Sequence, residues 1–253
     1  MSRFLSKASE SLLPYTPGEQ PQGRKFIKLN TNECPYPPSP KVAEAILAGY
    51  EEIAAGCGTA GAAGRAEKAD CGCDAGATEA GKMAEKVAQI MPPELANLRL
   101  YSDPEERVLI EAIAAHYRVG TNQVIAGNGS DEILGFAFRA FCDSEAPLQF
   151  ADLTYGFYPA LCGLYGIPFR VVPLEEDFTL NIEPYKNCGN NVIIANPNAP
   201  TGMNLPLSAI EEVAASNPDR VVMVDEAYVD FGAATAQPLL EKYENLLVVQ
   251  TTS

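Results

Sequence analysis

Positive charge is scarce in this sequence. Only 18 Lys and Arg residues stand against 33 Asp and Glu residues, which gives the 253-residue chain a formal net charge of -15. A chain this acidic repels the phosphates of nucleic acids and the head groups of anionic lipids. We therefore expect neither a nucleic acid nor a membrane surface among its partners.

Long apolar runs are also missing. No apolar stretch approaches the roughly 18 residues that a membrane-spanning helix needs. Ser, Lys and Glu interrupt the N-terminal segment MSRFLSKASESLLPY, whereas a secretion signal has an uninterrupted apolar centre. The sequence therefore predicts a cytoplasmic protein.

Histidine is nearly absent, and the cysteines do not replace it as metal ligands. The only histidine is His116, which is far from the one suggestive cluster, Cys71-Gly-Cys73 with Cys57. Because a zinc site usually takes four well-spaced ligands, we predict no metal site. Free thiols are expected for all seven cysteines: Cys34, Cys57, Cys71, Cys73, Cys142, Cys162 and Cys188.

Short apolar runs alternate with helical patterns in the second part of the chain. Fully apolar runs are typical of strands that are covered on both faces, so the alternation predicts an α/β fold with a mainly parallel sheet flanked by helices. Ligands of such sheets bind at the carboxyl ends of the strands. We expect strands at 124–126, 148–151, 192–195, 221–224 and 246–249, helices at 132–141 and 158–164, and a helix opened by the capping box Ser208–Glu211.

Residues 47–92 have a different composition from the rest of the chain. Ala, Gly and small polar residues dominate there, and such a stretch cannot bury much apolar surface. We interpret it as a mobile insert or a loose helical excursion, in which 79–90 has the best helical spacing. The chain is thus divided into an N-terminal arm (1–46), an insert (47–92) and an α/β domain (93–253).

Two short motifs after strand ends are suited to an anion and to a flat ring. In GNGSDE (127–132) the glycines permit a tight turn, and the following helix offers free amides to an anion. Ser130 adds a hydroxyl donor, although Ser130 or Asp131 could equally be the helix N-cap. The aromatics of DLTYGFY (152–158) can stack on a flat ring, or they can be buried packing residues.

Two further motifs supply polar groups at strand ends. The segment NPNAPTG (196–202) is a stiff turn with two prolines, two asparagines and a glycine, and a plain turn is the alternative reading. Asp225 follows the apolar strand 221–224, so its carboxylate is partly desolvated and needs a partner. A protonated pyridine nitrogen is one such partner, and a helix cap is the alternative.

Seven motifs in this order resemble the fold-type I aminotransferases, and among them the histidinol-phosphate aminotransferase family. The N-terminal motif favours that branch. The motifs are KLNTNE (28–33) with PYPPSP (35–40), LRLYSDP (98–104), GNGSDEIL (127–134), TYGFYPAL (154–161), NPNAPTG (196–202), VDEAYVDF (224–231) and VVQTTS (248–253).

The resemblance implies pyridoxal 5′-phosphate (PLP) as the cofactor, bound by the α/β domain 93–253, with the start of a small domain within 1–46. It implies that Gly129, Ser130 and Asp131 lie at the cofactor phosphate, Tyr155 stacks on the ring, Asp225 pairs with the ring nitrogen, Tyr228 bonds the ring hydroxyl, and Thr251 and Ser253 help to hold the phosphate.

The implied reaction is amino transfer between L-histidinol phosphate and 2-oxoglutarate in histidine biosynthesis. Tyr101 is similar to a tyrosine that reaches the phosphate of the neighbouring subunit, which implies a homodimer. Tyr15 and Asn32 are similar to residues that close over the substrate. Another PLP aminotransferase, such as one for aromatic amino acids, and a non-catalytic fragment are the alternatives.

Three features depart from the family pattern. Ala199 stands where the family usually has an Asn that bonds the ring hydroxyl, so that role falls to Asn198 or is lost. The insert 47–92 has no counterpart in the pattern. The Schiff-base lysine is expected directly after Ser253, so we expect no catalytic residue within the chain and a large domain that is incomplete at its C-terminus.

Overall fold

A computed structural model describes residues 2–10, 12–13, 38–56, 95, 98 and 100–252. The chain divides into two compact units, one formed by Met1–Tyr15 with Arg107–Ser253 and the other by Thr16–Glu106. In the second unit, helix α2 (Pro40–Gly56) begins at a proline, whose fixed φ suits the first helical position. This helix continues past residue 47, where the sequence predicts the start of an insert, and the expected helix 79–90 lies outside the described residues.

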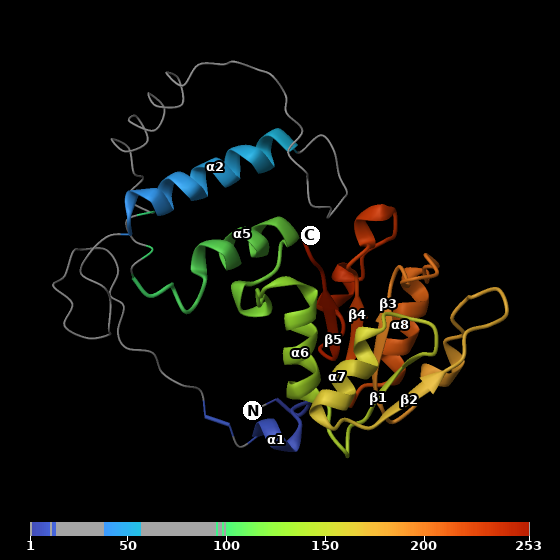
Figure 1. Ribbon diagram of the computed structural model, residues 1–253. Helices are drawn as coiled ribbons and strands as arrows, with labels where there is room; N and C mark the ends of the chain where they lie inside the picture. The colour runs from blue at the N-terminus through green and yellow to red at the C-terminus, as the bar shows by residue number, and fades with distance from the viewer. Residues whose placement is uncertain are drawn as a thin grey trace. The chain divides into compact units, whose positions relative to one another are not determined.

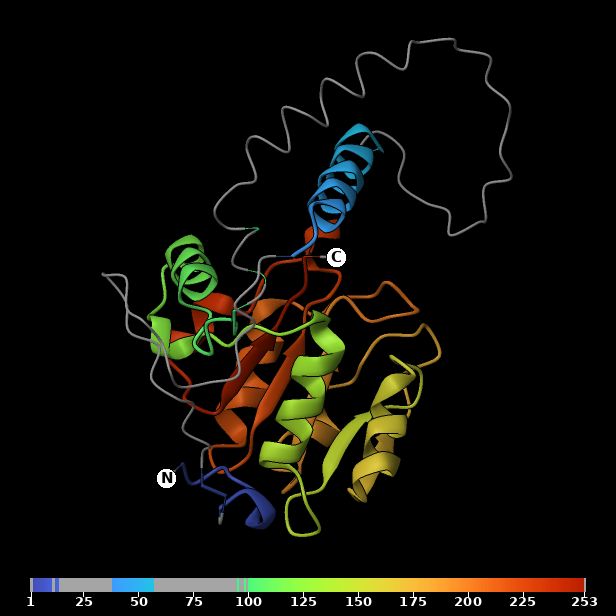
Figure 2. The same cartoon turned by 60° about the vertical axis from the view of Figure 1, so that its left-hand side comes forward.

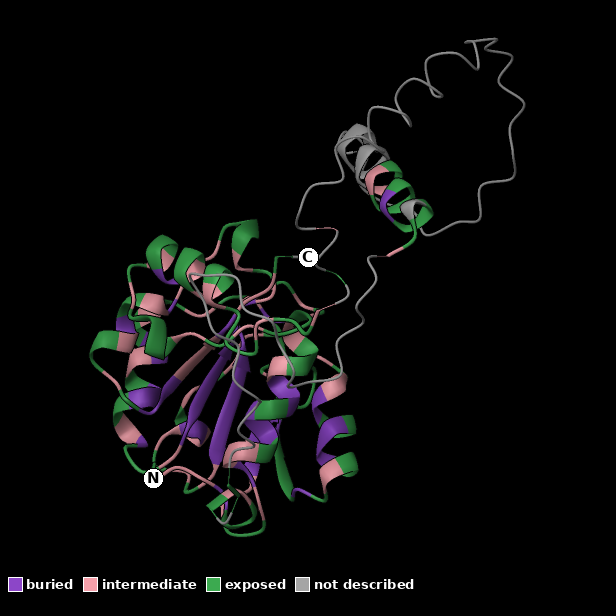
Figure 3. Ribbon diagram, turned by 90° about the vertical axis from the view of Figure 1, so that its left-hand side faces the viewer, coloured by how far each residue is buried: buried purple, intermediate pink, exposed green. Residues whose placement is uncertain are grey.

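The first unit is built on a five-stranded, fully parallel sheet with the strand order β2-β1-β3-β4-β5 (Figure 1). Its central strands are buried on both faces, as the fully apolar runs predict (Figure 3). The α/β fold with a mainly parallel sheet is thus confirmed. The strands are β1 (Leu148–Ala151), β2 (Phe169–Val172), β3 (Asn191–Ala195), β4 (Val222–Asp225) and β5 (Leu246–Val249).

Helices cover both faces of this sheet, as Figures 1 and 2 show for α6 and α7 on one side and α8 on the other. Successive side chains of a strand point to opposite faces, so Met223 joins the α6–α7 core while Val222 and Val224 join the α8 core. Asp225 lies two residues after Met223 and therefore faces α6 and α7. The helices of this unit include α6 (Gly129–Phe141), α7 (Phe157–Tyr165), α8 (Leu207–Ser216), η3 (Glu183–Tyr185) and η5 (Gln237–Glu241).

The N-terminal residues belong to the same unit as the sheet. The short helix α1 (Lys7–Glu10) contacts α6, because Ser6 donates from its backbone N–H to the carbonyl of Ala140 and from its hydroxyl to the carbonyl of Arg139. These carbonyls belong to the last turn of α6, which has no intrahelical donors left for them. Residues 2–10 thus cap the C-terminus of α6.

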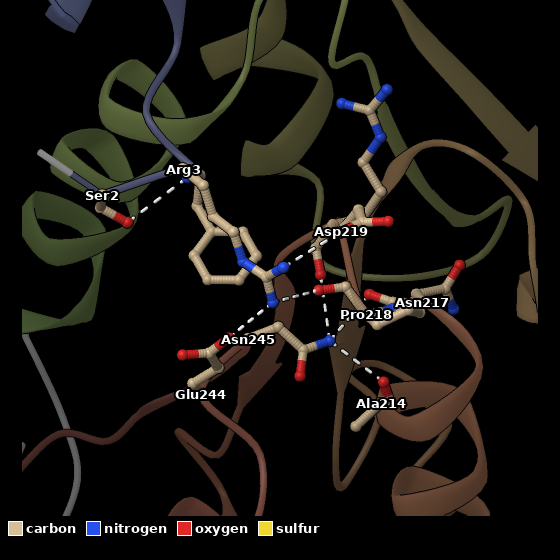
Figure 4. A network of polar contacts seen from close by, with 10 residues as sticks. Ser2, Arg3, Ala214, Asn217, Pro218, Asp219, Glu244 and Asn245 are labelled. Atoms are coloured by element: carbon tan, nitrogen blue, oxygen red, sulfur yellow. Dashed lines mark hydrogen bonds and ion pairs between the residues drawn. The ribbon is translucent and has the colours of Figure 1, made fainter.

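A polar network holds the same N-terminal residues at the amino ends of β4 and β5 (Figure 4). The guanidinium of Arg3 bonds the carboxylates of Asp219 and Glu244 and the carbonyl of Pro218. Beside it, the buried amide of Asn245 donates to the carbonyls of Ala214, Asn217 and Arg220. This network therefore lies at the opposite end of the strands from Asp225.

Two expectations about local structure are wrong. Residues 124–126 form no strand: Val124 has extended backbone angles (φ -120, ψ 135), but no described segment supplies ladder partners. Ser208 does not open a capping box, because α8 already begins at Leu207 after the N-cap Pro206, whose ring has no side-chain acceptor. The remaining helices of this unit are α5 (Arg107–Tyr117), η2 (Thr121–Gln123) and η4 (Val229–Phe231).

None of the described helices is long and apolar enough to cross a membrane.

Candidate functional site

A cavity of about 160 Å³ lies at the carboxyl ends of β3, β4 and β5. Its wall combines one buried carboxylate with four hydroxyls, two of which belong to tyrosines. It brings together five residues that the sequence predicts as cofactor ligands: Ser130, Tyr155, Asp225, Tyr228 and Thr251. The rest of the lining is small or apolar and consists of Ala195, Pro197, Ala199 and Ala227.

Asp225 ends β4 and is only 4% exposed. Its Oδ2 accepts a hydrogen bond from the Tyr158 hydroxyl at 2.7 Å, and its Oδ1 accepts one from the backbone N–H of Ala227 at 3.2 Å. Burial raises the pKa of Asp225 above its ordinary value, the two hydrogen bonds oppose this shift, and the nearby charge of Asp131 adds to it. Its carboxylate is therefore desolvated, as expected, and it has two neutral hydrogen-bond donors within the protein.

The helix α6 begins beside this carboxylate. A Cβ at Gly127 would lie 2.8 Å from Ile133 Cδ1 and 2.9 Å from Glu132 Oε2, so glycine lets these two side chains pack against the turn. Asn128 is the N-cap of α6 and donates its N–H to Glu132 Oε2 at 2.7 Å. Ser130 and Asp131 are thus not the cap but lie in the first turn, where amide groups have no partner within the helix.

Tyr155 and Asp131 are joined across the cavity edge. The Tyr155 hydroxyl donates to Asp131 Oδ1 at 3.1 Å, and the ring meets that of Tyr158 edge-on with centroids 5.6 Å apart. Burial first, and then the bond to Asp131, raises the pKa of Tyr155. The hydrogen bond holds the Tyr155 ring in the cavity wall, with its side chain between the start of α6 and the start of α7.

Asn198 is a predicted ligand whose side chain does not line the cavity. It is buried and fully engaged: Oδ1 accepts from the Thr154 hydroxyl at 2.7 Å, and Nδ2 donates to the carbonyl of Leu153 at 2.9 Å and to Thr201 Oγ1 at 3.0 Å. These bonds tie the loop after β3 to the loop after β1. The neighbouring Ala199 faces the cavity instead.

Two buried residues at this site were missed by the sequence reasoning. Tyr158 is fully buried and bonds Asp225. Glu226 is also buried, and it accepts hydrogen bonds from the Thr235 hydroxyl (2.7 Å), the Gln250 side chain (2.7 Å) and the backbone N–H of Ala236 (2.5 Å). The argument that an acidic residue after an apolar strand is desolvated applies to Glu226 as well as to Asp225 and could have found it.

Several predicted residues lie elsewhere. Gly129 starts α6 with a positive φ of 79 and lines a second cavity, of about 290 Å³, beside β5. Tyr101 belongs to the other compact unit and is 57% exposed. Tyr15, Asn32 and Ser253 lie outside the described residues.

The cysteines and other metal-ligating side chains form no candidate metal centre in the part of the chain that the structure describes. Cys142, Cys162 and Cys188 are free thiols there, as the sequence predicts. Burial raises the pKa of Cys142 to about 12, so this thiol stays protonated at neutral pH. The other four, Cys34, Cys57, Cys71 and Cys73, lie outside the described residues.

Comparisons with known proteins agree with this geometry. The family of class I and II aminotransferases matches residues 77–253. Histidinol-phosphate aminotransferase 2 of Dechloromonas aromatica is 44% identical over 254 residues, which cover 100% of this chain and 60% of the relative. A histidinol-phosphate aminotransferase of Pseudomonas putida strain W619 is also 44% identical, with the same shares covered. The chain thus spans about 60% of the length of these curated relatives.

Solved structures share the fold. Histidinol-phosphate aminotransferase of Sinorhizobium meliloti, in complex with pyridoxal-5′-phosphate, has a TM-score of 0.57 at 23% identity and covers 66% of this chain and 48% of its own. Aspartate aminotransferase of Thermus thermophilus with maleate also has a TM-score of 0.57, at 21% identity, over 67% of this chain and 49% of its own. On the match over residues 77–253, this chain belongs to the class I and II aminotransferase family.

Proposed function

We propose that the cavity at the carboxyl ends of β3, β4 and β5 binds PLP, and that the protein transfers the amino group of L-histidinol phosphate to 2-oxoglutarate in histidine biosynthesis. The observation that carries the proposal is Asp225, a desolvated carboxylate in the wall of a cavity that also presents an aromatic ring and a helix N-terminus. The relatives that are 44% identical and named histidinol-phosphate aminotransferase support the choice of substrate.

The residues of the cavity fit the ring of the cofactor. A buried carboxylate with a raised pKa is stabilised by a neighbouring cation, and a protonated pyridine nitrogen supplies one. Tyr155 offers an aromatic face for stacking, and the Tyr228 hydroxyl at the same cavity is suited to the ring hydroxyl. When bound, PLP supplies an electron-withdrawing ring that stabilises negative charge on the substrate, and an aspartate that keeps the nitrogen protonated strengthens this effect.

The start of α6 fits the phosphate. This helix has 13 residues, and the partial positive charge at its N-terminus attracts an anion. The backbone amides of Ser130 and Asp131 and the hydroxyls of Ser130 and Thr251 are the donors that we assign to the phosphate; Gly129 starts the helix there, and its own amide donates to the carbonyl of Gly127 at 3.1 Å. The Asp131 carboxylate is directed to the Tyr155 hydroxyl, so the contribution of Asp131 to phosphate binding comes from its backbone N–H.

The assembly and the remaining contacts are parts of the same proposal. We assign Tyr101 to the phosphate of a neighbouring subunit in a homodimer, Tyr15 and Asn32 to the substrate, and Ser253 to the phosphate. These four assignments, the co-substrate 2-oxoglutarate and the cytoplasmic location rest on the sequence and stay predictions. Asn198 is the weakest of the proposed cofactor ligands, because its side-chain atoms already bond Thr154, Leu153 and Thr201.

The test is a transamination assay on the protein that the whole reading frame encodes, supplied with PLP and 2-oxoglutarate. We expect turnover with L-histidinol phosphate at least tenfold faster than with L-phenylalanine, which corresponds to about 1.4 kcal/mol of discrimination. Turnover with phenylalanine alone would contradict the substrate assignment. Spectroscopic titration with PLP checks the cofactor separately, and a protein that binds no PLP would contradict the whole proposal.

A further inference from the structure

We propose that Tyr158 is a positioning residue that fixes the orientation of the Asp225 carboxylate and keeps it ionised for the cofactor ring. The inference rests on the proposed function, because it gives Asp225 the role of partner to the ring nitrogen. Tyr158 itself does not line the cavity and lies behind Asp225.

The contact between the two residues is short and shielded from water. The Tyr158 hydroxyl donates to Asp225 Oδ2 at 2.7 Å, and the exposed fractions of the two residues are 0% and 4%. A hydroxyl donor to an ionised carboxylate forms a charge-assisted bond, which is about twice as strong as one between neutral groups. The two residues are 67 positions apart in the chain, so the bond also links α7 to the end of β4.

The phenol ring of Tyr158 is held on several sides. Its centroid lies 6.2 Å from that of Phe138 in α6, 5.9 Å from that of Phe150 in β1 and 5.6 Å from that of Tyr155 in the loop before α7. Close-packed rings in a core leave little freedom for rotation. The direction of the hydroxyl is therefore set by the core, independently of any ligand in the cavity.

This geometry divides the two oxygens of Asp225 between the protein and the cavity. Oδ2 accepts the hydroxyl of Tyr158, whereas Oδ1 accepts the longer bond from the Ala227 N–H at 3.2 Å. A carboxylate oxygen accepts about two hydrogen bonds, so Oδ1 keeps capacity for a donor on the cofactor. Without the Tyr158 hydroxyl, the carboxylate would be free to turn and would lose its strongest donor.

The same bond works against the protonation of Asp225. Burial is the largest influence and raises the pKa of Asp225, while the bond from Tyr158 lowers it. The other ionisable groups around it are Asp131 from α6, whose charge raises the pKa, Tyr155 from the loop before α7 and Tyr228 from the segment after β4. Of these four side chains, Tyr158 is the one that donates a hydrogen bond to Asp225, and with the backbone N–H of Ala227 it favours the ionised carboxylate.

The experiment measures the binding of pyridoxamine 5′-phosphate across a range of pH. This probe has the ring and the phosphate but no aldehyde, so its binding reports non-covalent contacts alone. Tyr158→Phe is compared with Tyr185→Phe, a matched control: Tyr185 is equally buried, and its hydroxyl has no hydrogen-bond partner in the described part of the chain. Circular dichroism checks that each variant is folded.

We expect Tyr158→Phe to weaken probe binding about tenfold at neutral pH, the effect of losing one hydrogen bond to a charged group. Binding needs ionised Asp225, so the affinity falls as the pH falls through the pKa of that group; we call this decrease the acid limb of the binding profile. Because loss of the Tyr158 hydroxyl raises this pKa, the acid limb should move to higher pH. Tyr185→Phe should leave both the affinity and the acid limb as in the unmodified chain.

Other outcomes overturn the inference in distinguishable ways. If the unmodified chain does not bind the probe, the proposed function fails and the positioning role fails with it. If it binds and Tyr158→Phe behaves in the same way, only the positioning role is wrong. A uniform loss of affinity with an unmoved acid limb would show a structural role alone. Should Tyr158→Phe not fold, 3,5-difluorotyrosine in place of Tyr158 supplies a stronger donor of similar size, and an acid limb that does not move to lower pH overturns the role.

Discussion

The carboxylate of Asp225 illustrates how a functional residue can oppose stability. Its folded-state pKa is raised by burial, so the folded chain binds a proton more readily than the unfolded chain does. Folding is then favoured at low pH, and this contribution is lost as the pH rises through the raised pKa. At neutral pH, the desolvated charge of Asp225 therefore destabilises the fold.

The corresponding prediction concerns Asp225→Asn. The amide has no charge to desolvate and can still accept the hydroxyl of Tyr158 through its oxygen. We expect the variant to gain roughly 1 kcal/mol in the free energy of unfolding at pH 7, while its affinity for pyridoxamine 5′-phosphate falls. Urea unfolding at pH 7 and pH 5 measures this, and the gain should shrink at the lower pH. A variant that is less stable at pH 7 would contradict the account.

Asn198 and Ala199 are neighbours with opposite environments. Asn198 is buried in three side-chain hydrogen bonds, whereas Ala199 lines the cavity. We expect Asn198→Ala to lower the free energy of unfolding by about 1–3 kcal/mol, because buried partners lose their bonds, and to change probe affinity by less than about threefold, which is below 0.7 kcal/mol.

The matched variant is Ala199→Asn, which adds an amide at the cavity wall. It should strengthen binding of pyridoxamine 5′-phosphate without a comparable change in stability. Calorimetric titration and thermal unfolding of both variants are the measurements. If Asn198→Ala removes probe binding while stability is unchanged, Asn198 is a cofactor ligand after all.

At the scale of elements, Glu226 connects three segments around the site. Its carboxylate accepts bonds from Thr235 and Ala236, at the far end of the loop that carries Tyr228, and from Gln250, which precedes Thr251. The backbone N–H of Glu226 also extends the pairing of β4 with β5 by donating to the carbonyl of Val249 at 2.7 Å. One buried side chain thus holds both ends of the loop and the start of the segment after β5.

We expect Glu226→Ala to lower the free energy of unfolding by about 2–4 kcal/mol, since three buried donors lose their acceptor. Glu226→Gln should lower the free energy of unfolding by less than Glu226→Ala does. The amide of Gln250 can turn so that its oxygen accepts a hydrogen bond from the amide of the new Gln side chain. Glu244→Ala is the control at an exposed carboxylate, with an expected effect of about 1 kcal/mol or less. Chemical denaturation of the three variants gives the order, and equal costs for Glu226→Ala and Glu244→Ala would refute the proposed connection.

The elements also show what could be predicted from the sequence. The strand at 148–151 matches β1, the strand at 192–195 begins one residue late, and 221–224 is displaced by one residue from β4. A strand that is covered on both faces can be predicted from its own sequence, because all of its residues are apolar. The predicted strand at 124–126 was wrong because a strand needs a neighbouring strand to pair with, and the local sequence does not show whether one is present. The bond between Tyr158 and Asp225 was missed for the same reason, since it joins residues 67 positions apart.

At the scale of the whole molecule, the N-terminal residues and the sheet form one unit although residues 16–106 lie between them in the sequence. The hydrogen bonds from Ser6 and Ser9 satisfy carbonyls in the last turn of α6, and Phe4 packs against the core on that face of the sheet. The ion pairs of Arg3 are exposed, with more than half of the guanidinium side chain accessible to solvent. We therefore expect the N-terminal residues to stabilise this unit through the hydrogen bonds to the end of α6 and the packing of Phe4, and not through the ion pairs of Arg3.

Deletion of residues 2–10 and the single substitution Arg3→Ala separate the two contributions. The deletion exposes the carbonyls of Arg139 and Ala140 and the core surface under Phe4, so we expect a loss of about 2–4 kcal/mol in the free energy of unfolding. Arg3→Ala should cost less than about 1 kcal/mol, and half of that loss should vanish in high salt, because exposed ion pairs are screened. Urea denaturation at low and high salt measures both. If Arg3→Ala proves as costly as the deletion, the ion pairs of Figure 4 hold the N-terminal residues in place, and the cap on α6 is secondary.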